Sequence, residues 1–210
     1  MIIEGMTTQE IYNEFNNDLK SVVSKYIHLF PEMRRIAIKS KSKICKKIIN
    51  YTSPRKNKWI IILTHNIKGA TAQSCCYYYN KQGLNLMLPN IQDGIPIHYT
   101  PHFLTRYKER FLINTNLNCV DLIIDFIQNN PINVISIKKG EVFGSFNQGV
   151  GLGEIEMVSN NNLLIHFKTY VSENMLKGKQ IITNHEQINK INEHLSELPN
   201  KVKINLETAL

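Results

Sequence analysis

Apolar residues in the first part of the chain recur at helical spacing. One stripe runs over residues 11–30, and Thr7 or Thr8 precedes it with Glu10 in the first turn, which is the arrangement of a capped helix start. Pro31 ends or restarts this helix, because proline lacks the amide hydrogen that the helix needs. The pattern therefore predicts a helix that begins at Thr7 or Thr8 and reaches residue 30.

A second, basic helix is predicted from about residue 32 to residue 49, with its isoleucines inward and its lysines outward, and Ser53-Pro54 ends it. Short β-prone runs follow this helix. The turn Asn80-Lys81-Gln82-Gly83 joins two of them into a hairpin. The predicted strands are 59–63, 73–79, 84–88 and 95–99.

The pattern changes at Thr100-Pro101, a hydroxyl N-cap followed by proline at the first helical position. A helix is predicted from there to Leu112, and Asn118 caps a second helix over 120–128. Helices followed by an antiparallel meander define an α+β fold class, with helices packed on the meander. The remaining predicted elements are strands at 132–137, 142–146, 154–159 and 163–170 and short helices near 172–178 and 186–198.

The distribution of charge divides the chain. The net charge is +8, yet residues 33–92 hold twelve basic residues and no acidic one. An unmixed positive segment is typical of a surface that binds a polyanion, most simply nucleic acid, although a solvated lysine-rich face is the alternative. We expect a basic helical and β region over 1–95 and an α+β domain over 96–210, or one continuous domain. The predicted nucleic-acid-binding residues are Arg34, Arg35, Lys39, Lys43, Lys46, Lys47, Arg55 and Lys56.

The sequence also excludes several classes of protein. No apolar run approaches the ~18 residues of a membrane span, and the first residues lack the pattern of a secretory signal. We therefore expect a soluble, cytoplasmic protein without a membrane partner. The four cysteines form no CxxC pair, so we expect reduced thiols rather than a zinc ribbon.

The predicted helix after Thr100 carries a pattern suited to phosphate chemistry. His102, Arg106 and Arg110 are spaced four apart and lie along one face of the helix. A neutral imidazole can move a proton, and two guanidinium groups can hold charge on phosphate oxygens. The alternative is a surface helix whose arginines pair with carboxylates such as Glu109 or Asp121.

The last predicted strand contributes further candidates. Strict alternation places His166, Lys168 and Tyr170 on one face and Thr169, with its apolar neighbours, on the other. Both faces cannot belong to the core, so one of them carries polar groups into a cleft or into water. Lys168 and Tyr170 are candidates on chemistry alone.

A helix with HxxxRxxxR, a second helix, an antiparallel meander and a last strand with a threonine (FKTYVS) resemble the barnase–EndoU–colicin–RelE (BECR) superfamily of small RNases. The resemblance covers about residues 97–180. Members are typically metal-independent RNases, often toxins or effectors, that attack the phosphate with the neighbouring 2′-hydroxyl and leave a cyclic phosphate. The resemblance implies that His102 is the acid or base, that Arg106 and Arg110 stabilise the phosphate, and that Thr169 is a site hydroxyl. It implies RNA as substrate and no cofactor, and it leaves open an antitoxin or immunity protein as partner.

Two rival hypotheses remain. His98 and His102 could begin a metal site with His166, but Thr100-Pro101 breaks the helix between the first two, so helical i, i+4 geometry is lost and we expect no metal. A non-catalytic nucleic-acid-binding or assembly protein of a phage or mobile element is the stronger rival. The RNase hypothesis requires the polar groups of the Thr100 helix and of the last strand to meet in one cleft.

Overall fold

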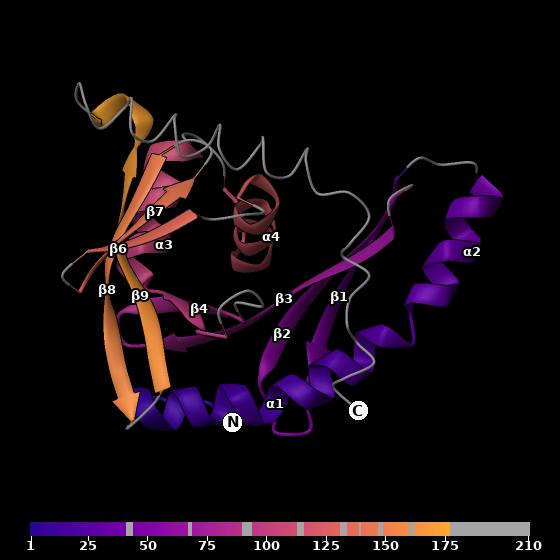
Figure 1. Ribbon diagram of the computed structural model, residues 1–210, viewed down its shortest axis with the longest axis horizontal. Helices are drawn as coiled ribbons and strands as arrows, with labels where there is room; N and C mark the ends of the chain where they lie inside the picture. The colour runs from indigo at the N-terminus through magenta and orange to yellow at the C-terminus, as the bar shows by residue number, and fades with distance from the viewer. Residues whose placement is uncertain are drawn as a thin grey trace.

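The structure, a computed structural model, consists of helices around one large sheet (Figure 1). It describes residues 1–40, 44–66, 69–89, 94–112, 116–130, 134–138, 140–146, 149–159 and 162–176. The predicted α+β fold class is confirmed, because helices accompany a sheet that is mostly antiparallel. The helix predicted near 186–198 lies outside the described residues.

Two helices, α1 (Thr8–Ile27) and α2 (Phe30–Ser40), open the chain. Thr7 caps α1 as its sequence predicts: its side chain accepts from the Glu10 amide, and the Glu10 carboxylate accepts from the Thr7 amide at 2.7 Å. Helical structure restarts at Phe30, immediately before Pro31, so the proline restarts the helix rather than ending it. Both helices contribute to the same core.

Nine strands and two further helices complete the described elements, together with a short 3-10 turn. They are β1 (Ile44–Thr52), β2 (Lys58–Asn66), β3 (Gly69–Asn80), β4 (Gly83–Leu88), β5 (Ile97–Tyr99), α3 (Pro101–Phe111), α4 (Cys119–Asn129), β6 (Val134–Lys138), β7 (Glu141–Phe146), β8 (Gly149–Ser159), β9 (Asn162–Ser172) and η1 (Glu173–Met175). Thr100 caps α3 and Asn118 caps α4, as the sequence predicts.

The strands form one nine-stranded sheet in the order β1-β2-β3-β4-β5-β9-β8-β7-β6. Every neighbouring pair is antiparallel except β5 and β9, which are parallel and pair over three residues. The sheet therefore continues through the boundary expected between 1–95 and 96–210. It has one core on each face, because alternate residues of β2 belong to different cores.

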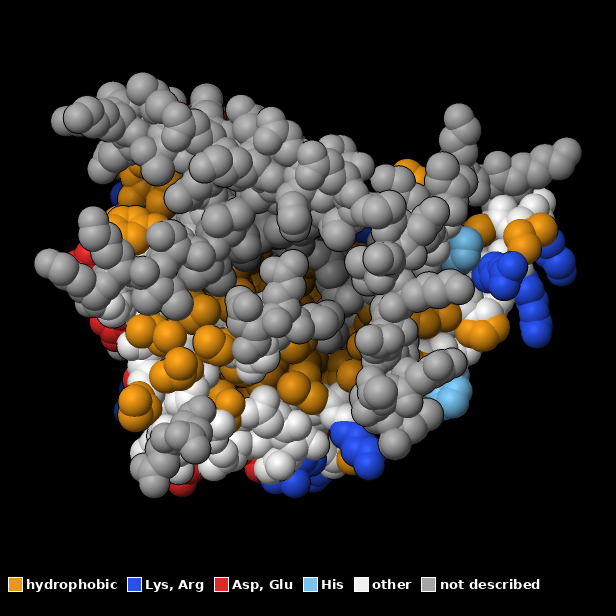
Figure 2. Space-filling view, viewed as in Figure 1, with side chains coloured by type: hydrophobic (Ala, Val, Ile, Leu, Met, Phe, Trp, Pro, Cys, Tyr) orange, Lys and Arg blue, Asp and Glu red, His pale blue; other side chains and the backbone are white. Residues whose placement is uncertain are grey.

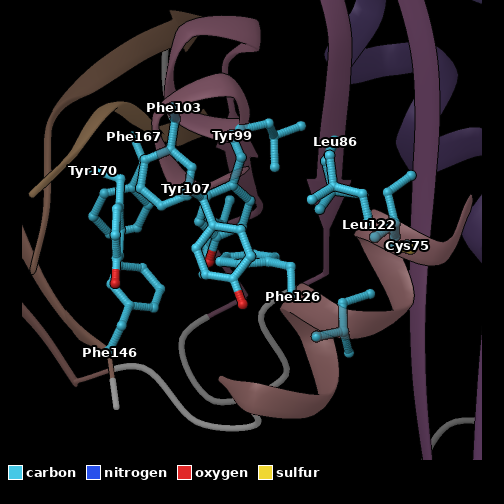
Figure 3. Close-up of a cluster of buried hydrophobic side chains, with 14 of the residues drawn as sticks. Cys75, Leu86, Tyr99, Phe103, Tyr107, Leu122, Phe126, Phe146, Phe167 and Tyr170 are labelled. Atoms are coloured by element: carbon cyan, nitrogen blue, oxygen red, sulfur yellow. The ribbon is translucent and has the colours of Figure 1, made fainter. Parts of the chain in front are cut away.

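One face of the sheet is covered by α3 and α4. Its core contains an aromatic cluster in which Tyr99 of β5 stacks on Phe167 of β9 with ring centroids 5.3 Å apart (Figure 3). Phe103 of α3 packs on both of these rings, and Tyr107 of α3 packs on Tyr170 of β9. These contacts fix α3 against the middle of the sheet.

The opposite face is covered by α1 and α2. Phe15 of α1 stacks on Trp59 of β2 at 5.2 Å, and the buried Asp18 carboxylate accepts from Trp59 Nε1 at 3.1 Å and from Asn57 Nδ2 at 2.7 Å. Asn57 Oδ1 in turn accepts from the Ile2 amide at 2.6 Å. These bonds satisfy buried polar atoms and fix α1 to the β1–β2 turn.

The basic helix predicted over 32–49 is wrong beyond Ser40. Residues 44–52 form β1, which pairs with β2 over nine consecutive residues. Cys45, Ile49 and Tyr51 alternate toward the core, whereas Ile44 and Ile48, expected inward on a helix, are exposed. β-Branched residues favour a strand, and the long edge of β2 supplies the backbone partners.

Candidate functional site

Helix α3 carries the predicted stripe of His102, Arg106 and Arg110, but the three side chains do not share one environment. At 100° per residue the stripe turns by about 80° between its first and last members. His102 is exposed, and no hydrogen bond from it to the described residues is present. Arg106 pairs with Glu109 at 2.8 Å, which is the carboxylate pairing of the alternative hypothesis.

Arg110 contacts the edge of β9 beyond the three residues that pair with β5. β5 ends at Tyr99, but β9 continues five residues past its last paired position. Thr100 Oγ1 donates to the Lys168 carbonyl at 3.2 Å, and Arg110 Nη1 donates to the Tyr170 carbonyl. The start and the end of α3 thus satisfy the backbone of β9 where no strand of the described sheet does. Arg110 also lines an open depression of about 420 Å³ with Phe111, Ser172, Glu173 and Asn174.

A β-bulge at Lys168 changes the faces expected for the last strand. Gly153 of β8 pairs with Phe167, and the preceding Leu152 pairs with Thr169, so Lys168 is the extra residue. Tyr170 consequently lies in the core with Phe167, and its placement beside His166 and Lys168 is wrong. Thr169 takes the other face, which is the face of His166.

Apart from Tyr170, the two predicted polar sets lie on opposite faces of the sheet. The apolar residues of α3 belong to the core that contains Phe167 and Tyr170. His166 lies two residues after Leu164 along β9, so these two share a face, and Leu164 belongs to the other core. The structure therefore brings Lys168 and Thr169 together with His166, but it does not bring His102, Arg106 and Arg110 into a shared cleft with them.

A pair of histidines occupies the second face, where β5 and β9 run side by side. His98 and His166 are direct partners in the parallel register, and their Nδ1 atoms are 2.9 Å apart. The rings meet at 80° with centroids 5.0 Å apart, so the pair is joined edge to face. Backbone pairing alone sets this proximity.

Polar groups on neighbouring strands extend the pair in both directions. On the inner side, His98 Nε2 lies 3.0 Å from Asn85 Oδ1 of β4 and 3.3 Å from the Tyr78 hydroxyl of β3. On the outer side, His166 Nε2 lies 2.7 Å from Glu156 Oε2 of β8, a close polar contact without the geometry of a hydrogen bond. We call these five residues the histidine relay: Tyr78, Asn85, His98, His166 and Glu156.

The relay is buried at one end and open at the other. Burial, with repulsion from His166, lowers the pKa of His98 to about 3, so this ring is neutral. Burial also lowers the pKa of His166, although Glu156 and Glu154 oppose that shift. Burial raises the pKa of Tyr78, which keeps its proton. Glu156 is 40 % exposed and forms the outer end.

Lys168 extends the open end of the relay. It is exposed at the bulge and pairs with Glu154, the residue opposite His166 in the β8–β9 register. The Glu156 carboxylate and the Lys168 ammonium group are therefore exposed, and the His166 imidazole lies just below the surface next to them. This set can transfer protons and hold one anionic group.

A metal centre finds no support in this arrangement. Among the described ranges, no three His, Cys, Asp or Glu side chains are grouped so that they could hold a metal ion. The His98 and His166 nitrogens contact each other, and Glu156 lies at the opposite nitrogen of the second ring. His102, the second ligand considered from sequence, lies on α3 at the other face.

The predicted nucleic-acid-binding residues fall in three places. Arg34, Arg35 and Lys39 are exposed on α2, where Figure 2 shows Lys and Arg side chains gathered at one end of the molecule. Lys46 is exposed on β1, and Lys47 pairs with Glu32 at 3.4 Å. Arg55 and Lys56 occupy the β1–β2 turn, and Arg55 pairs with Glu14. Lys43 lies outside the described residues.

Sequence reasoning missed the histidine relay. His98 and His166 are 68 residues apart, and each stands alone within a short apolar strand. The one available signal was that each strand has a histidine between two apolar residues, as Ile-His-Tyr in one and Ile-His-Phe in the other. Only the parallel register between β5 and β9 converts that similarity into a contact.

Comparison of the chain with protein-family models, with curated proteins and with solved structures finds no match in any of the three. No helix within the described ranges is long and apolar enough to cross a membrane. The function is therefore argued from the surface of α2 and from the histidine relay.

Proposed function

We propose that the protein binds nucleic acid, with RNA preferred, through phosphate contacts on the outer face of α2. One observation carries the proposal: Arg34, Arg35 and Lys39 lie within an arc of about 140° on the side opposite buried Met33. None of the three forms an ion pair with the described residues, so their charges are available to a ligand. The preference for RNA rests on the resemblance to the BECR superfamily.

The same arc includes Ile38, which is 67 % exposed. An apolar side chain among cations suits a ligand that offers both phosphates and base or sugar surfaces, as single-stranded RNA does. Acidic groups near this face are already neutralised, since Glu32 pairs with Lys47. The face of α2 therefore attracts anions without internal competition.

The binding proposal is tested by fluorescence anisotropy with a labelled single-stranded RNA at several salt concentrations. Arg34→Gln/Arg35→Gln should weaken binding and reduce the log–log salt slope by about 1.4, at ~0.7 for each phosphate that the protein no longer neutralises. The control Lys20→Gln/Lys81→Gln removes the same charge from exposed positions of α1 and the β3–β4 turn and should leave the slope nearly unchanged. Equal effects of the two variants would contradict a site on α2. Single-stranded DNA of the same sequence should bind more weakly.

A second candidate function, cleavage of RNA, is favoured by the histidine relay. We propose a BECR-like endoribonuclease in which Glu156 takes the proton of the 2′-hydroxyl while the 2′-oxygen attacks phosphorus. The bond to the 5′-oxygen breaks, and that oxygen leaves with the proton returned from Glu156, giving a 2′,3′-cyclic phosphate and a 5′-hydroxyl. Lys168 would hold a phosphate oxygen, with Thr169 beside it on the same face.

The order of strand β5, helices α3 and α4, and meander β6–β9 supports this candidate, since the resemblance expects helices packed on a meander. The toxin role and an antitoxin or immunity partner belong to the same proposal. In this candidate His102, Arg106 and Arg110 would act only as phosphate contacts on the far face of the sheet.

Cleavage is tested with a 5′-labelled RNA in EDTA, where activity should persist and the products should carry cyclic phosphate. Glu156→Gln should lower the rate by roughly two to four orders of magnitude, the usual contribution of a general acid or base. His102→Ala serves as the matched variant on α3, since both side chains are partly or fully exposed. If His102→Ala shows this loss and Glu156→Gln keeps full activity, the catalytic site is on α3 and not at Glu156.

A further inference from the structure

We propose that Tyr78 and His98 are positioning residues that determine which ring nitrogen of His166 carries its proton. Within the relay they place the His166 proton on Nε2, the nitrogen 2.7 Å from Glu156. The inference rests on the cleavage candidate for its catalytic consequence only, because the proton positions can be measured without RNA.

The argument begins with a count of protons. Three contacts link the relay from the inner side to Glu156: His98 Nε2 to its inner partner, Nδ1 to Nδ1, and His166 Nε2 to Glu156. Each of the first two contacts needs one hydrogen between its atoms, and a carboxylate oxygen 2.7 Å from His166 Nε2 favours a hydrogen on that nitrogen too. Two neutral imidazoles bring only two hydrogens, so the inner partner must supply the third or the pair must bind an extra proton.

Tyr78 can supply that third hydrogen. If its hydroxyl donates to His98 Nε2, then His98 Nδ1–H donates to His166 Nδ1, and the remaining hydrogen of His166 is on Nε2, next to Glu156. Every hydrogen then points outward, and both rings stay neutral. Neutral rings are what burial imposes, because it lowers the pKa of both histidines.

Asn85 supports the opposite direction. Its Nδ2 donates to the Gly83 carbonyl at 3.1 Å, which leaves Oδ1 facing His98 Nε2 as an acceptor. With a hydrogen on His98 Nε2, the His98 Nδ1 must accept from His166 Nδ1–H. The neutral His166 Nε2 would then face the Glu156 carboxylate without a hydrogen between them, which is unfavourable unless His166 binds a proton.

The relay therefore has two arrangements that differ by one proton. In the neutral relay the hydrogens are donated in one direction, from Tyr78 to His98 and from His98 to His166. In the protonated relay the charged His166 donates from Nδ1 to His98, the His98 Nε2–H is donated to Asn85, and a second hydrogen of His166 is on Nε2, next to Glu156. The charged and titratable groups that face His166 are His98 on β5, Glu154 and Glu156 on β8 and Lys168 on β9. Removing the Tyr78 hydroxyl leaves only the protonated arrangement fully bonded.

Nuclear magnetic resonance of the imidazole nitrogens tests this directly on the intact protein. At pH 8 the wild type should show His98 protonated at Nδ1 and His166 at Nε2. Tyr78→Phe should move the His98 proton to Nε2 and raise the pH at which His166 titrates by about one unit or more, since one bonded arrangement is removed. The control Tyr79→Phe changes the next residue of β3, which is exposed and lies on the other face, and should change neither.

Two results separate this inference from the proposed cleavage. If the Tyr78→Phe spectrum keeps the wild-type proton positions and His166 titration, the positioning role is wrong whatever the activity. If the spectra change as expected but no RNA is cleaved under any condition, cleavage is wrong and the proton arrangement stands. Where cleavage is present, Tyr78→Phe should also change its pH profile and Tyr79→Phe should not, because the charge of His166 next to Glu156 changes only in the first variant.

Discussion

Glu14 of α1 is placed between two cations. Its carboxylate accepts from Arg55 Nε at 2.9 Å and from the chain's terminal ammonium at 3.1 Å. The hydrogen bonds from Arg55 are the largest influence, and they lower the pKa of Glu14 from 4.5 to about 2. The folded state therefore favours the ionised carboxylate more than the unfolded chain does.

This shift predicts a loss of stability in acid. The contribution of Glu14 should be complete above about pH 4.5 and should disappear as the pH falls toward 2, because the unfolded chain takes up the proton first. Urea unfolding of wild type and Glu14→Gln should therefore differ at pH 6 and converge at pH 2.5. Glu109→Gln, in an exposed pair on α3, is the control and should cost at most about 0.5 kcal/mol.

His98 should make the folding stability depend on pH in a second range, at higher pH than the range of Glu14. Its folded-state pKa is about 3 against 6.5 ordinarily, so between these values the unfolded chain binds a proton that the folded chain excludes. Stability should fall as the pH decreases from 6.5, by up to ~1.4 kcal/mol per pH unit from this residue. His98→Gln should flatten the curve between pH 6.5 and 4.5, above the range of Glu14. An unchanged slope would mean that His98 is protonated in the folded state.

Single residues differ in how far their surroundings can be predicted from sequence. Thr7, Thr100 and Asn118 each cap a helix as predicted, because a cap depends on residues within the same turn. Tyr170 was misplaced because its face depends on one extra residue, Lys168, in the ladder with β8. Nothing within the FKTYVS segment itself marks that bulge.

At the scale of elements, the glycines of β8 explain how the aromatic cluster lies flat on the sheet. Gly149, Gly151 and Gly153 lie within β8, and the ladder with β9 changes register between Leu152 and Gly153, opposite the bulged Lys168. A Cβ on Gly151 would lie 2.5 Å from the Phe146 ring, and one on Gly153 would lie 1.8 Å from the His166 carbonyl oxygen. These positions therefore admit no side chain.

Gly153→Ala should be strongly destabilising. The added methyl group meets backbone rather than a movable side chain, so the β8–β9 ladder itself must shift, at a cost of about 3 kcal/mol or more. Thermal unfolding measures the loss. The control Gly140→Asn places a side chain in open space, at a positive φ that asparagine tolerates, and should cost much less. A small effect of Gly153→Ala would show that the bulge relaxes freely.

The elements also show where sequence patterns mislead. Residues 44–49 were predicted as the end of a helix because lysines and isoleucines alternate in a way that suits either period over a short run. The pairing with β2 decides for a strand, and no local residue signals that partner. Strands flanked by turns, such as β3 and β4 around Asn80-Lys81-Gln82-Gly83, were predictable because the turn chemistry lies between them.

For the whole molecule, the aromatic cluster joins the two parts of the sheet more than backbone bonds do. β5 pairs with β9 over only three residues, but Tyr99 packs on Phe103, Phe126 and Phe167. The core that contains this cluster also includes Ile60, Ile62, Cys75 and Leu86 of the first region expected from sequence, so the two regions should unfold together.

Tyr99→Ala should uncouple them. In the wild type, urea transitions followed by the fluorescence of Trp59, the single tryptophan, and by far-ultraviolet circular dichroism should coincide. In the variant the circular dichroism transition should begin at lower urea, because β6–β9 lose their link while β2 keeps its own core. Ile97→Val, a smaller change in the same strand, is the control and should shift both probes equally. Coincident curves in Tyr99→Ala would contradict this coupling.

The short parallel strand also sets an order of events during synthesis. Strands β1 to β4 can pair as soon as they emerge, since each hairpin is local, but β5 gains its second neighbour only when residues 165–167 have been made, 68 residues later. Contacts so distant along the chain form slowly. One side of β5 therefore remains an unpaired sheet edge until β9 has been made, and the pairing of β9 with β5 completes the sheet.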